Sequence, residues 1–579
     1  MGEVQQSVDT VRSIWPAYSL EQIESMLCAT GAPFEMEEVV IRGVPTRTWK
    51  NVPPTLAALA HIARSHGARC FTVHEDERVS YDAFFRATAT LAHALAARGV
   101  GRGDRVAIAM RNLPEWPVAF FAATAIGAIA VPLNAWWTGS ELEYALRDSG
   151  TRLLICDAER HARIAPHLSA LPDLTHVIVS RTSQPIEGAE LLDTMLGDAD
   201  GWAALPDTEL PEIAVEPDDA ATIFYTSGTT GHPKGALGTH RNILTNILST
   251  AYASARAALR RGDMPLPATP KTLLLVIPLF HVTACNAALM GAVFGGSTLV
   301  FMRRWDTVKA FELIERERVN STGGVPTIAW QLLEHPERAN YDLSSLETIS
   351  YGGAPSAPEL VRRIQAEFGC MPGNGWGMTE TSATVTSHVA EDYQHRPESC
   401  GPAVPVAELR IIADDGVTAL PPGEVGEIWA RGPQIVAGYW NKPEATAATF
   451  IDGWVRTGDL GRLDEEGFCY IVDRAKDIII RGGENIYSSE VENFLYDHPA
   501  VTDAALVGLS HRTLGEEPAA VVHLGPGMAA TEAELQDWVR ARLAAFKIPV
   551  RVLFCDDTLP RNANGKILKK ELKALFDQR

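Results

Sequence analysis

The residue types with the most definite chemistry stand together in residues 225–235, which read YTSGTTGHPKG. The three Gly residues let main-chain N–H groups approach a ligand closely, and the four hydroxyl side chains can donate hydrogen bonds. Lys234 adds a positive charge near the end of the run. This combination predicts a loop that holds phosphate groups; the alternative is a flexible surface turn.

This run differs from the two commonest phosphate-binding motifs. A P-loop has a longer spacing between its glycines and places Lys after the second one, whereas Lys234 precedes Gly235. A second Gly-rich run, GNGWGM at 373–378, places its third Gly too early for a dinucleotide-binding fingerprint. We therefore expect phosphate binding by a different structural solution.

Composition limits the classes of function. The chain has 579 residues, of which 46% are hydrophobic and 21% are charged, as in a globular protein. Its net charge of −21 argues against a uniformly basic nucleic-acid-binding or membrane-binding protein. Any polyanionic ligand must therefore be held by local positive charge and by backbone dipoles.

The cysteines and the apolar segments indicate a cytoplasmic protein without stable membrane insertion. The eight cysteines are scattered and form no CxxC pair, so free thiols are expected rather than a zinc site or disulfides. The polar N-terminus MGEVQQSVDT does not resemble a secretory signal. Residues 118–133 are the most apolar run, but they are short for a membrane span, and we expect a buried helix leading into a strand.

Short β-rich runs alternate with longer helical patterns from residue 105 to about 353, which predicts parallel strands with crossover helices. After about 402 the pattern changes to a small β unit, and from about 475 to a compact unit of strands and helices. A capping box of Thr531 and Glu534 predicts a helix through Leu543. The expected parallel strands are 105–110, 153–156, 176–180, 221–227, 272–278, 297–302 and 347–353.

Further motifs follow the Gly-rich run in a fixed order: IPLFHV (277–282), YGGAP (351–355), GWGMTE (375–380), RTGDL (456–460), VDRAKDIIIRGGENIY (472–487) and PRNANGK (560–566). With this set the chain resembles the adenylate-forming superfamily, which includes acyl-CoA synthetases, 4-coumarate–CoA ligase and firefly luciferase. The resemblance extends from about residue 55 to 575, and the ordered set is far more specific than any one motif.

The resemblance implies an α/β fold. A large N-terminal domain (1–473) would contain parallel-rich sheets, flanking helices and the small β unit. A hinge (474–476, with Lys476 as its pivot) would lead to a small mobile α+β C-terminal domain (477–579). It also implies a two-step reaction with Mg²⁺, in which a carboxylate attacks the α-phosphate of ATP and the thiol of CoA then displaces AMP.

The resemblance assigns ATP-binding roles residue by residue. The β- and γ-phosphates would be held by Thr226, Ser227, Gly228, Thr229, Thr230 and Lys234. Glu380 would bind Mg²⁺, because a hard cation prefers carboxylate oxygen, and Thr379 would donate to the α-phosphate. Adenine and ribose would contact Gly353, Ala354, Asn374, Gly375, Trp376, Asp459, Arg474 and Asn485. Relatives mostly have Tyr in place of Trp376, so this chain lacks the phenol oxygen.

Lys566 would bridge the attacking carboxylate and the α-phosphate, since a cation between two approaching anions stabilises the transition state. The C-terminal domain would then swing at Lys476, so that Gly482 and Gly483 let the pantetheine of CoA pass. Arg481 is a candidate for the CoA phosphates. His281 would lie beside the acyl carboxylate.

The acyl pocket would be lined by Val325, Gly352, Gly377 and Met378, which are small or apolar and carry no charge. This favours an apolar acid, with a medium- or long-chain fatty acid as the main reading. The alternatives are an aryl-acid–CoA ligase and an enzyme that loads a carrier protein; a non-catalytic nucleotide sensor fits less well with the intact Lys566. The expected partners are the carboxylic acid, ATP and CoA, without nucleic acid, and a homodimer is a candidate assembly.

Overall fold

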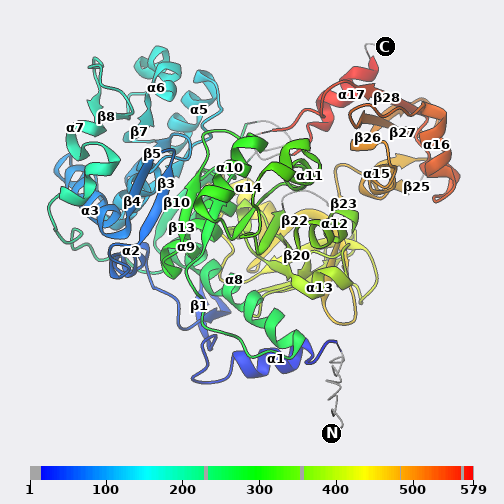
Figure 1. Cartoon of the computed structure of the whole chain (residues 1–579), viewed down its shortest axis with the longest axis horizontal. Coiled ribbons are helices and arrows are strands. Elements are labelled where there is room, and N and C mark those ends of the chain that lie inside the picture. The colour runs from blue at the N-terminus through cyan, green and yellow to red at the C-terminus, as the bar shows by residue number, and fades with distance from the viewer. Residues whose placement is uncertain (1–14, 227–231, 353–357, 483, 563–565, 578–579) are drawn as a thin grey trace, which may run out of the picture.

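The computed structural model describes residues 15–226, 232–352, 358–482, 484–562 and 566–577. A large N-terminal domain is built around two mainly parallel sheets, and a smaller C-terminal domain forms the orange and red end of the molecule (Figure 1). A helix and a hairpin precede the main sheets: α1 (Leu20–Leu27), β1 (Met36–Ile41) and β2 (Val44–Trp49).

The first main sheet has seven strands in the order β11-β10-β6-β5-β7-β8-β9. All neighbours are parallel except β10 and β11, which pair antiparallel on either side of the Gly-rich run. The strands are β5 (Arg105–Ala109), β6 (Ile129–Pro132), β7 (Leu153–Asp157), β8 (His176–Ser180), β9 (Glu190–Leu191), β10 (Ala220–Tyr225) and β11 (Gly235–Thr239).

The second main sheet has eight strands in the order β17-β16-β15-β14-β12-β13-β3-β4 and is antiparallel only at its two ends. Its strands are β3 (Cys70–His74), β4 (Glu77–Ser80), β12 (Thr272–Leu275), β13 (Thr298–Phe301), β14 (Ser321–Gly324), β15 (Thr348–Gly352), β16 (Met371–Trp376) and β17 (Thr386–Val389).

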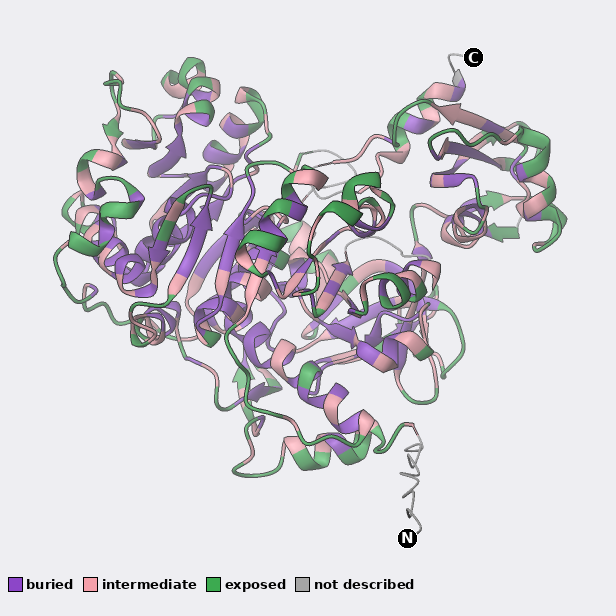
Figure 2. Cartoon of the chain, in the orientation of Figure 1, coloured by how far each residue is buried: buried purple, intermediate pink, exposed green. Residues whose placement is uncertain are grey.

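Helices pack against these sheets and complete the core, in which the central strands are buried (Figure 2). Every residue of α4 (Glu115–Ala125) is buried, as expected for a helix that is apolar all round. The other helices of this part are α2 (Leu56–Ser65), α3 (Tyr81–Ala97), α5 (Gly139–Ser149), α6 (Ala158–Ile164), α7 (Leu192–Leu196), α8 (His240–Arg261), α9 (Met290–Gly295), α10 (Thr307–Glu317), α11 (Pro326–Glu334), α12 (Pro358–Phe368) and α13 (Ala390–His395).

A six-stranded sheet completes the N-terminal domain and ends at Arg474. The C-terminal domain has its own five-stranded sheet, which begins at Ile479, so the chain changes sheets across the predicted hinge. The elements are β18 (Gly401–Pro402), β19 (Glu408–Ile412), β20 (Gly426–Arg431), α14 (Pro443–Thr449), β21 (Phe450–Ile451), β22 (Trp454–Leu463), β23 (Phe468–Arg474), β24 (Ile479–Arg481), β25 (Glu484–Ile486), α15 (Ser488–Tyr496), β26 (Val501–His511), β27 (Gly515–Leu524), α16 (Glu532–Arg540), β28 (Arg551–Cys555) and α17 (Lys569–Asp577).

The structure confirms the predicted fold class, each predicted parallel strand and the buried helix α4 that leads into β6. Two predicted ends differ by three residues, and the other strand ends differ by at most two. The strand expected at 272–278 stops at Leu275, ahead of Pro278, which has no N–H to donate to a ladder. The helix that Thr531 caps stops at Arg540 instead of Leu543. The exact domain boundaries stay a prediction.

The cysteines are free thiols, as expected. Within the described residues, no group of three or more His, Cys, Asp or Glu side chains could hold a metal ion. No helix in the described ranges has both the length and the apolar character needed to cross a membrane.

Candidate active site

The predicted site residues gather where parallel strands end. The predicted phosphate loop follows β10, His281 follows β12, Val325 follows β14, Gly352 ends β15 and Trp376 ends β16. In open α/β sheets, ligands bind at the carboxyl ends of the strands. Parallel pairing brings the ends of β12, β14, β15 and β16 to one edge of the second sheet, whereas β10 ends in the first sheet. Tyr439 connects the two, because it contacts both Lys234 beside the loop and Glu380 beyond β16.

The predicted phosphate loop is closed at its base by a hydrogen bond from Thr226 N to the Lys234 carbonyl oxygen, at 2.8 Å. Gly235 begins β11, where a Cβ atom would lie 2.5 Å from Ile223, so the close strand pairing requires Gly. Lys234 Nζ lies 5.0 Å from the centre of the Tyr439 ring. Ser227, Gly228, Thr229 and Thr230 lie outside the described residues, and their roles stay predictions.

Glu380 is a buried carboxylate, 6% exposed, that accepts a 2.6 Å hydrogen bond from the Tyr439 hydroxyl at Oε1. Burial raises the pKa of Glu380, and the Tyr439 bond and Lys234 act in the opposite direction. A buried carboxylate oxygen with little compensating charge suits a hard cation, so Glu380 fits Mg²⁺. The sequence analysis missed Tyr439, whose one sequence signal is the Gly-Tyr-Trp run at 438–440. In the structure an isolated bridge joins Tyr439 to Ala236 of β11.

The turn that carries Thr379 and Glu380 has an unusual backbone. Ser382 and Ala383 have φ values of 50° and 107°, which cost about 1–3 kcal/mol each for residues with a side chain. Gly377 is required, because a Cβ atom there would lie 1.4 Å from the Ala383 carbonyl oxygen. Such strain persists only where contacts with the surrounding structure fix the backbone conformation.

Asp459 connects the predicted adenine and ribose residues. It is 7% exposed and accepts a 2.8 Å hydrogen bond from Trp376 Nε1 at Oδ2, while Arg474 Nε lies 3.2 Å from Oδ1. Asp459 and Arg474 are also direct partners across β22 and β23. The indole of Trp376 thus provides a polar contact that Phe could not. Asn374 and Gly375 lie beside it on β16, and Gly353 and Ala354 lie outside the described residues.

Lys566 reaches this group from the C-terminal domain. Burial, followed by the charges of Arg474 and Lys476, lowers the pKa of Lys566 to about 7, and Asp459 acts in the opposite direction. Two hydrogen bonds join Lys566 to Asn562: Asn562 N donates to the Lys566 carbonyl, and Lys566 N donates to Asn562 Oδ1. The structure therefore brings Lys566, Lys476, Arg474 and Asp459 together.

His281 lies between β12 and a π-helix, Thr283–Leu289. Burial lowers its pKa to about 4, so the imidazole is neutral at ordinary pH. Val325 caps α11, and Gly352, Gly377 and Met378 lie at or just beyond neighbouring strand ends. Gly482 and Asn485 are exposed on the β24–β25 hairpin, and Gly483 lies outside the described residues. The roles of all these residues stay predictions.

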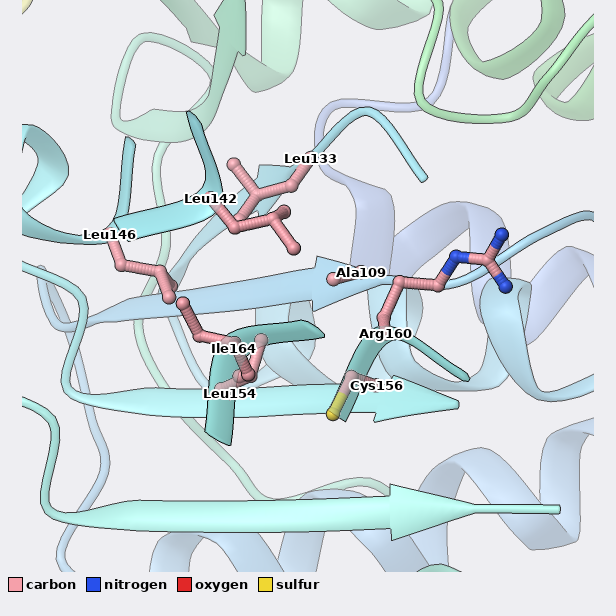
Figure 3. Close-up of a pocket in the computed structure, with 8 residues that line it drawn as sticks. All are labelled: Ala109, Leu133, Leu142, Leu146, Leu154, Cys156, Arg160 and Ile164. Carbon is pink, nitrogen blue, oxygen red and sulfur yellow. The ribbon is translucent and has the colours of Figure 1, made fainter. Parts of the chain in front are cut away.

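A separate pocket between β5, β7, α5 and α6 belongs to the core. It is lined by apolar side chains and by the stem of Arg160, whose guanidinium points away from the leucines (Figure 3). Arg160 Nε donates to the Ala135 carbonyl at 2.7 Å, and Nη1 pairs with Asp157. Arg160 therefore holds the loop after β6.

Replacing Trp376 with Phe should raise the apparent KM for ATP about tenfold, because a hydrogen bond to a charged group contributes about 1.5–3 kcal/mol. The KM for the acid should change less than about twofold. Trp305→Phe is the matched control, since it removes an indole hydrogen bond to Gln331 of α11, which is not part of this group. Equal ATP KM values in the two variants would contradict the role of the indole N–H.

Adenylate formation should lose kcat/KM as pH rises through about 7, because the lowered pKa of Lys566 leaves the free enzyme's amine neutral above that value. Pyrophosphate release across pH 5.5–9 measures this profile. Lys566→Arg should remove the inflection, since guanidinium stays protonated. An inflection that survives in Lys566→Arg would assign it to another group.

The sequence matches the family described as AMP-binding enzyme over residues 59–440 and the AMP-binding enzyme C-terminal domain over residues 490–566. A feruloyl-CoA synthase of Amycolatopsis sp is 37% identical and covers 87% of this chain and 95% of its own. A long-chain-fatty-acid–CoA ligase of Mycobacterium tuberculosis is 34% identical, and the match covers 86% of this chain and 94% of the ligase. The structure of o-succinylbenzoate CoA synthetase from Bacillus subtilis with its acyl-adenylate intermediate is 32% identical, covers 90% of this chain and 98% of that chain, and has a TM-score of 0.74. The chain therefore belongs to the AMP-binding enzyme family of adenylate-forming ligases.

Proposed function

We propose that this chain activates, with ATP, an apolar carboxylic acid that carries no second charged group, and transfers the acyl group to CoA, releasing AMP and pyrophosphate. The observation that carries the proposal is the group of Lys566, Arg474 and Asp459, which joins a lysine of the C-terminal domain to the predicted ribose site. Family membership and the buried Glu380 beside Lys234 support the same activity.

In the first step a carboxylate oxygen bonds the α-phosphorus of ATP, and pyrophosphate leaves with the electrons of the broken P–O bond. Lys566 pairs with the carboxylate and with the α-phosphate, which reduces their mutual repulsion. Asp459 and Trp376 orient the nucleoside, and Lys234 holds the outer phosphates. Glu380 would hold Mg²⁺, which would neutralise part of the phosphate charge. In the second step a thiol attacks the acyl carbonyl, and AMP leaves with the bonding electrons.

A medium- or long-chain fatty acid is the first substrate class to test. The predicted walls Val325, Gly352, Gly377 and Met378 offer no charge, and burial keeps His281 neutral. An aryl acid is the second class, because feruloyl-CoA synthases and 4-coumarate–CoA ligases are relatives at 37% and 32–33% identity. A cytoplasmic location and a homodimer complete the proposal.

Pyrophosphate release should be measured over fatty acids of graded length and over substituted benzoates and cinnamates. Lys566→Ala should lower adenylate formation at least about a hundredfold, because two anions then meet without the cation. It should spare thioester formation from supplied acyl-adenylate. Equal loss in both half-reactions would contradict the role of Lys566, and release of AMP only with a phosphopantetheinylated protein would favour carrier loading over CoA.

The nucleotide end of CoA can be placed on a basic, aromatic surface at the strand ends near His281. Trp136 is 43% exposed, with the Arg111 guanidinium 5.5 Å from its ring centre and the Phe280 ring 6.1 Å away. Phe280 directly precedes His281, and the side chain of Arg303 is 72% exposed. An indole face with arginines suits adenine and phosphate. Arg303 lies 3.8 Å from Glu159, so the positive charge of the cluster is partly compensated, as it is for Arg481 beside Glu517. Arg481, the earlier candidate, lies 3.6 Å from Glu517.

Trp136→Ala and Arg303→Ala should each raise the KM for CoA about five- to tenfold, because each removes part of a stacking or phosphate contact. CoA-independent pyrophosphate release should stay unchanged. Arg338→Ala is the matched control, because this arginine stacks on Phe368 elsewhere on the surface. A CoA KM equal to that of the control would exclude this surface as the CoA site.

A further inference from the structure

The strained turn at 379–383 is held by two buried asparagine side chains. Asn246 Nδ2 donates to the Ser382 carbonyl at 2.8 Å, and Asn286 Nδ2 donates to the same oxygen at 3.3 Å. Asn246 Oδ1 also accepts a hydrogen bond from Thr384 N at 2.9 Å. One side-chain amide therefore binds the backbone on both sides of Ala383. Both asparagines are at most 1% exposed.

These hydrogen bonds lie where they can fix the backbone conformation of Ser382 and Ala383. Ser382 and Ala383 both have positive φ, which residues with a side chain seldom adopt. Two donors on one carbonyl fix the direction of the peptide that joins these two residues. Asn286 Oδ1 meets no donor among the described residues, so the bond to Ser382 is what orients that buried amide.

The two asparagines belong to different parts of the site. Asn246 lies on α8, which directly follows β11 and so continues from the predicted phosphate loop. Asn286 lies on the π-helix that follows His281. Segments of π-helix are rare and concentrate at functional sites. The carbonyl of Ser382 thus joins the phosphate side of the site to its acyl side, two residues beyond Glu380.

We propose that Asn246 and Asn286 are positioning residues for the Thr379–Glu380 turn. Asn246 aims the turn at the Mg²⁺-bound phosphates, and Asn286 links its position to the acyl side of the site. The proposal rests on the proposed function, since it concerns the ATP and acid sites of that reaction. If the asparagines served only core packing, their loss would affect both half-reactions and every substrate alike.

The test compares Asn246→Ala, Asn246→Asp and Asn286→Ala with wild type and with Thr245→Val as control. Thr245 is buried on the same helix, and the bond that its hydroxyl makes among the described residues stays within α8, to the Arg241 carbonyl. The first readout is the shift in melting temperature that ATP causes with and without Mg²⁺, which does not depend on turnover. The others are the KM values for MgATP and acid, and thioester formation from supplied acyl-adenylate.

Asn246→Ala should weaken MgATP binding about tenfold and remove most of the Mg²⁺-dependent part of the thermal shift. Asn246→Asp should lie between it and wild type, because the acceptor for Thr384 N remains. Asn286→Ala should raise the KM values for MgATP and for the acid together, about threefold each. Thioester formation should stay within about twofold of wild type in all three, and Thr245→Val should match wild type throughout.

A folded Asn246→Ala protein with wild-type Mg²⁺-dependent stabilisation would overturn the proposal, as would equal losses in both half-reactions. If Asn246→Ala does not fold, Asn286→Ala decides the matter, because it removes a single longer hydrogen bond. An unchanged KM for MgATP in that variant would then overturn the proposal. Failure of the proposed function would look different: wild type would release no pyrophosphate with any acid, while thermal shifts by MgATP could still be measured.

Discussion

The site depends on the charge balance around one buried carboxylate, that of Asp459. Three segments compensate it: the indole N–H of Trp376 from β16, the guanidinium of Arg474 from β23, and the amine of Lys566 from the C-terminal domain. A carboxylate removed from water is costly unless it is paired and hydrogen-bonded. The same compensation brings a lysine from the far end of the chain to the predicted nucleotide site.

A second buried carboxylate, Asp473, fixes how the C-terminal domain meets the sheet. Ser488 N and Oγ both donate to it at the start of α15, and Lys569 Nζ bonds Ser488 Oγ and pairs with Glu492. Asp473 directly precedes the predicted hinge. These contacts join the two domains in an orientation in which the charge of Asp459 acts on Lys566. A rotation at Lys476, as the family resemblance implies, would have to rearrange these contacts before a thiol could replace Lys566.

The sequence predicted what is encoded by local pattern. Continuous apolar runs predicted the parallel strands. The family resemblance predicted that Trp376, Asp459, Arg474 and Lys566 share a nucleotide site. In the structure Trp376 and Arg474 contact Asp459, and the charge of Asp459 acts on Lys566, while the roles of these residues stay predictions. The sequence could not reveal contacts that only the tertiary fold creates. Asn246 and Asn286 look like ordinary polar residues within helical segments, and Tyr439 follows a glycine in a loop; their partners Ser382 and Glu380 are more than fifty residues away in sequence.

The lowered pKa of Lys566 follows from the same charge balance, which thereby controls whether the amine is protonated. Before substrates bind, the amine lies near Arg474 and Lys476 and is buried, so its charged form is disfavoured and its pKa is about 7. A carboxylate and a triphosphate bring negative charge to the same place and must favour the protonated amine. His281 is neutral and adds no competing cation on the acyl side. In the proposed reaction, substrate binding would therefore favour uptake of a proton at Lys566, and the ammonium group would be most stable when both anions are present.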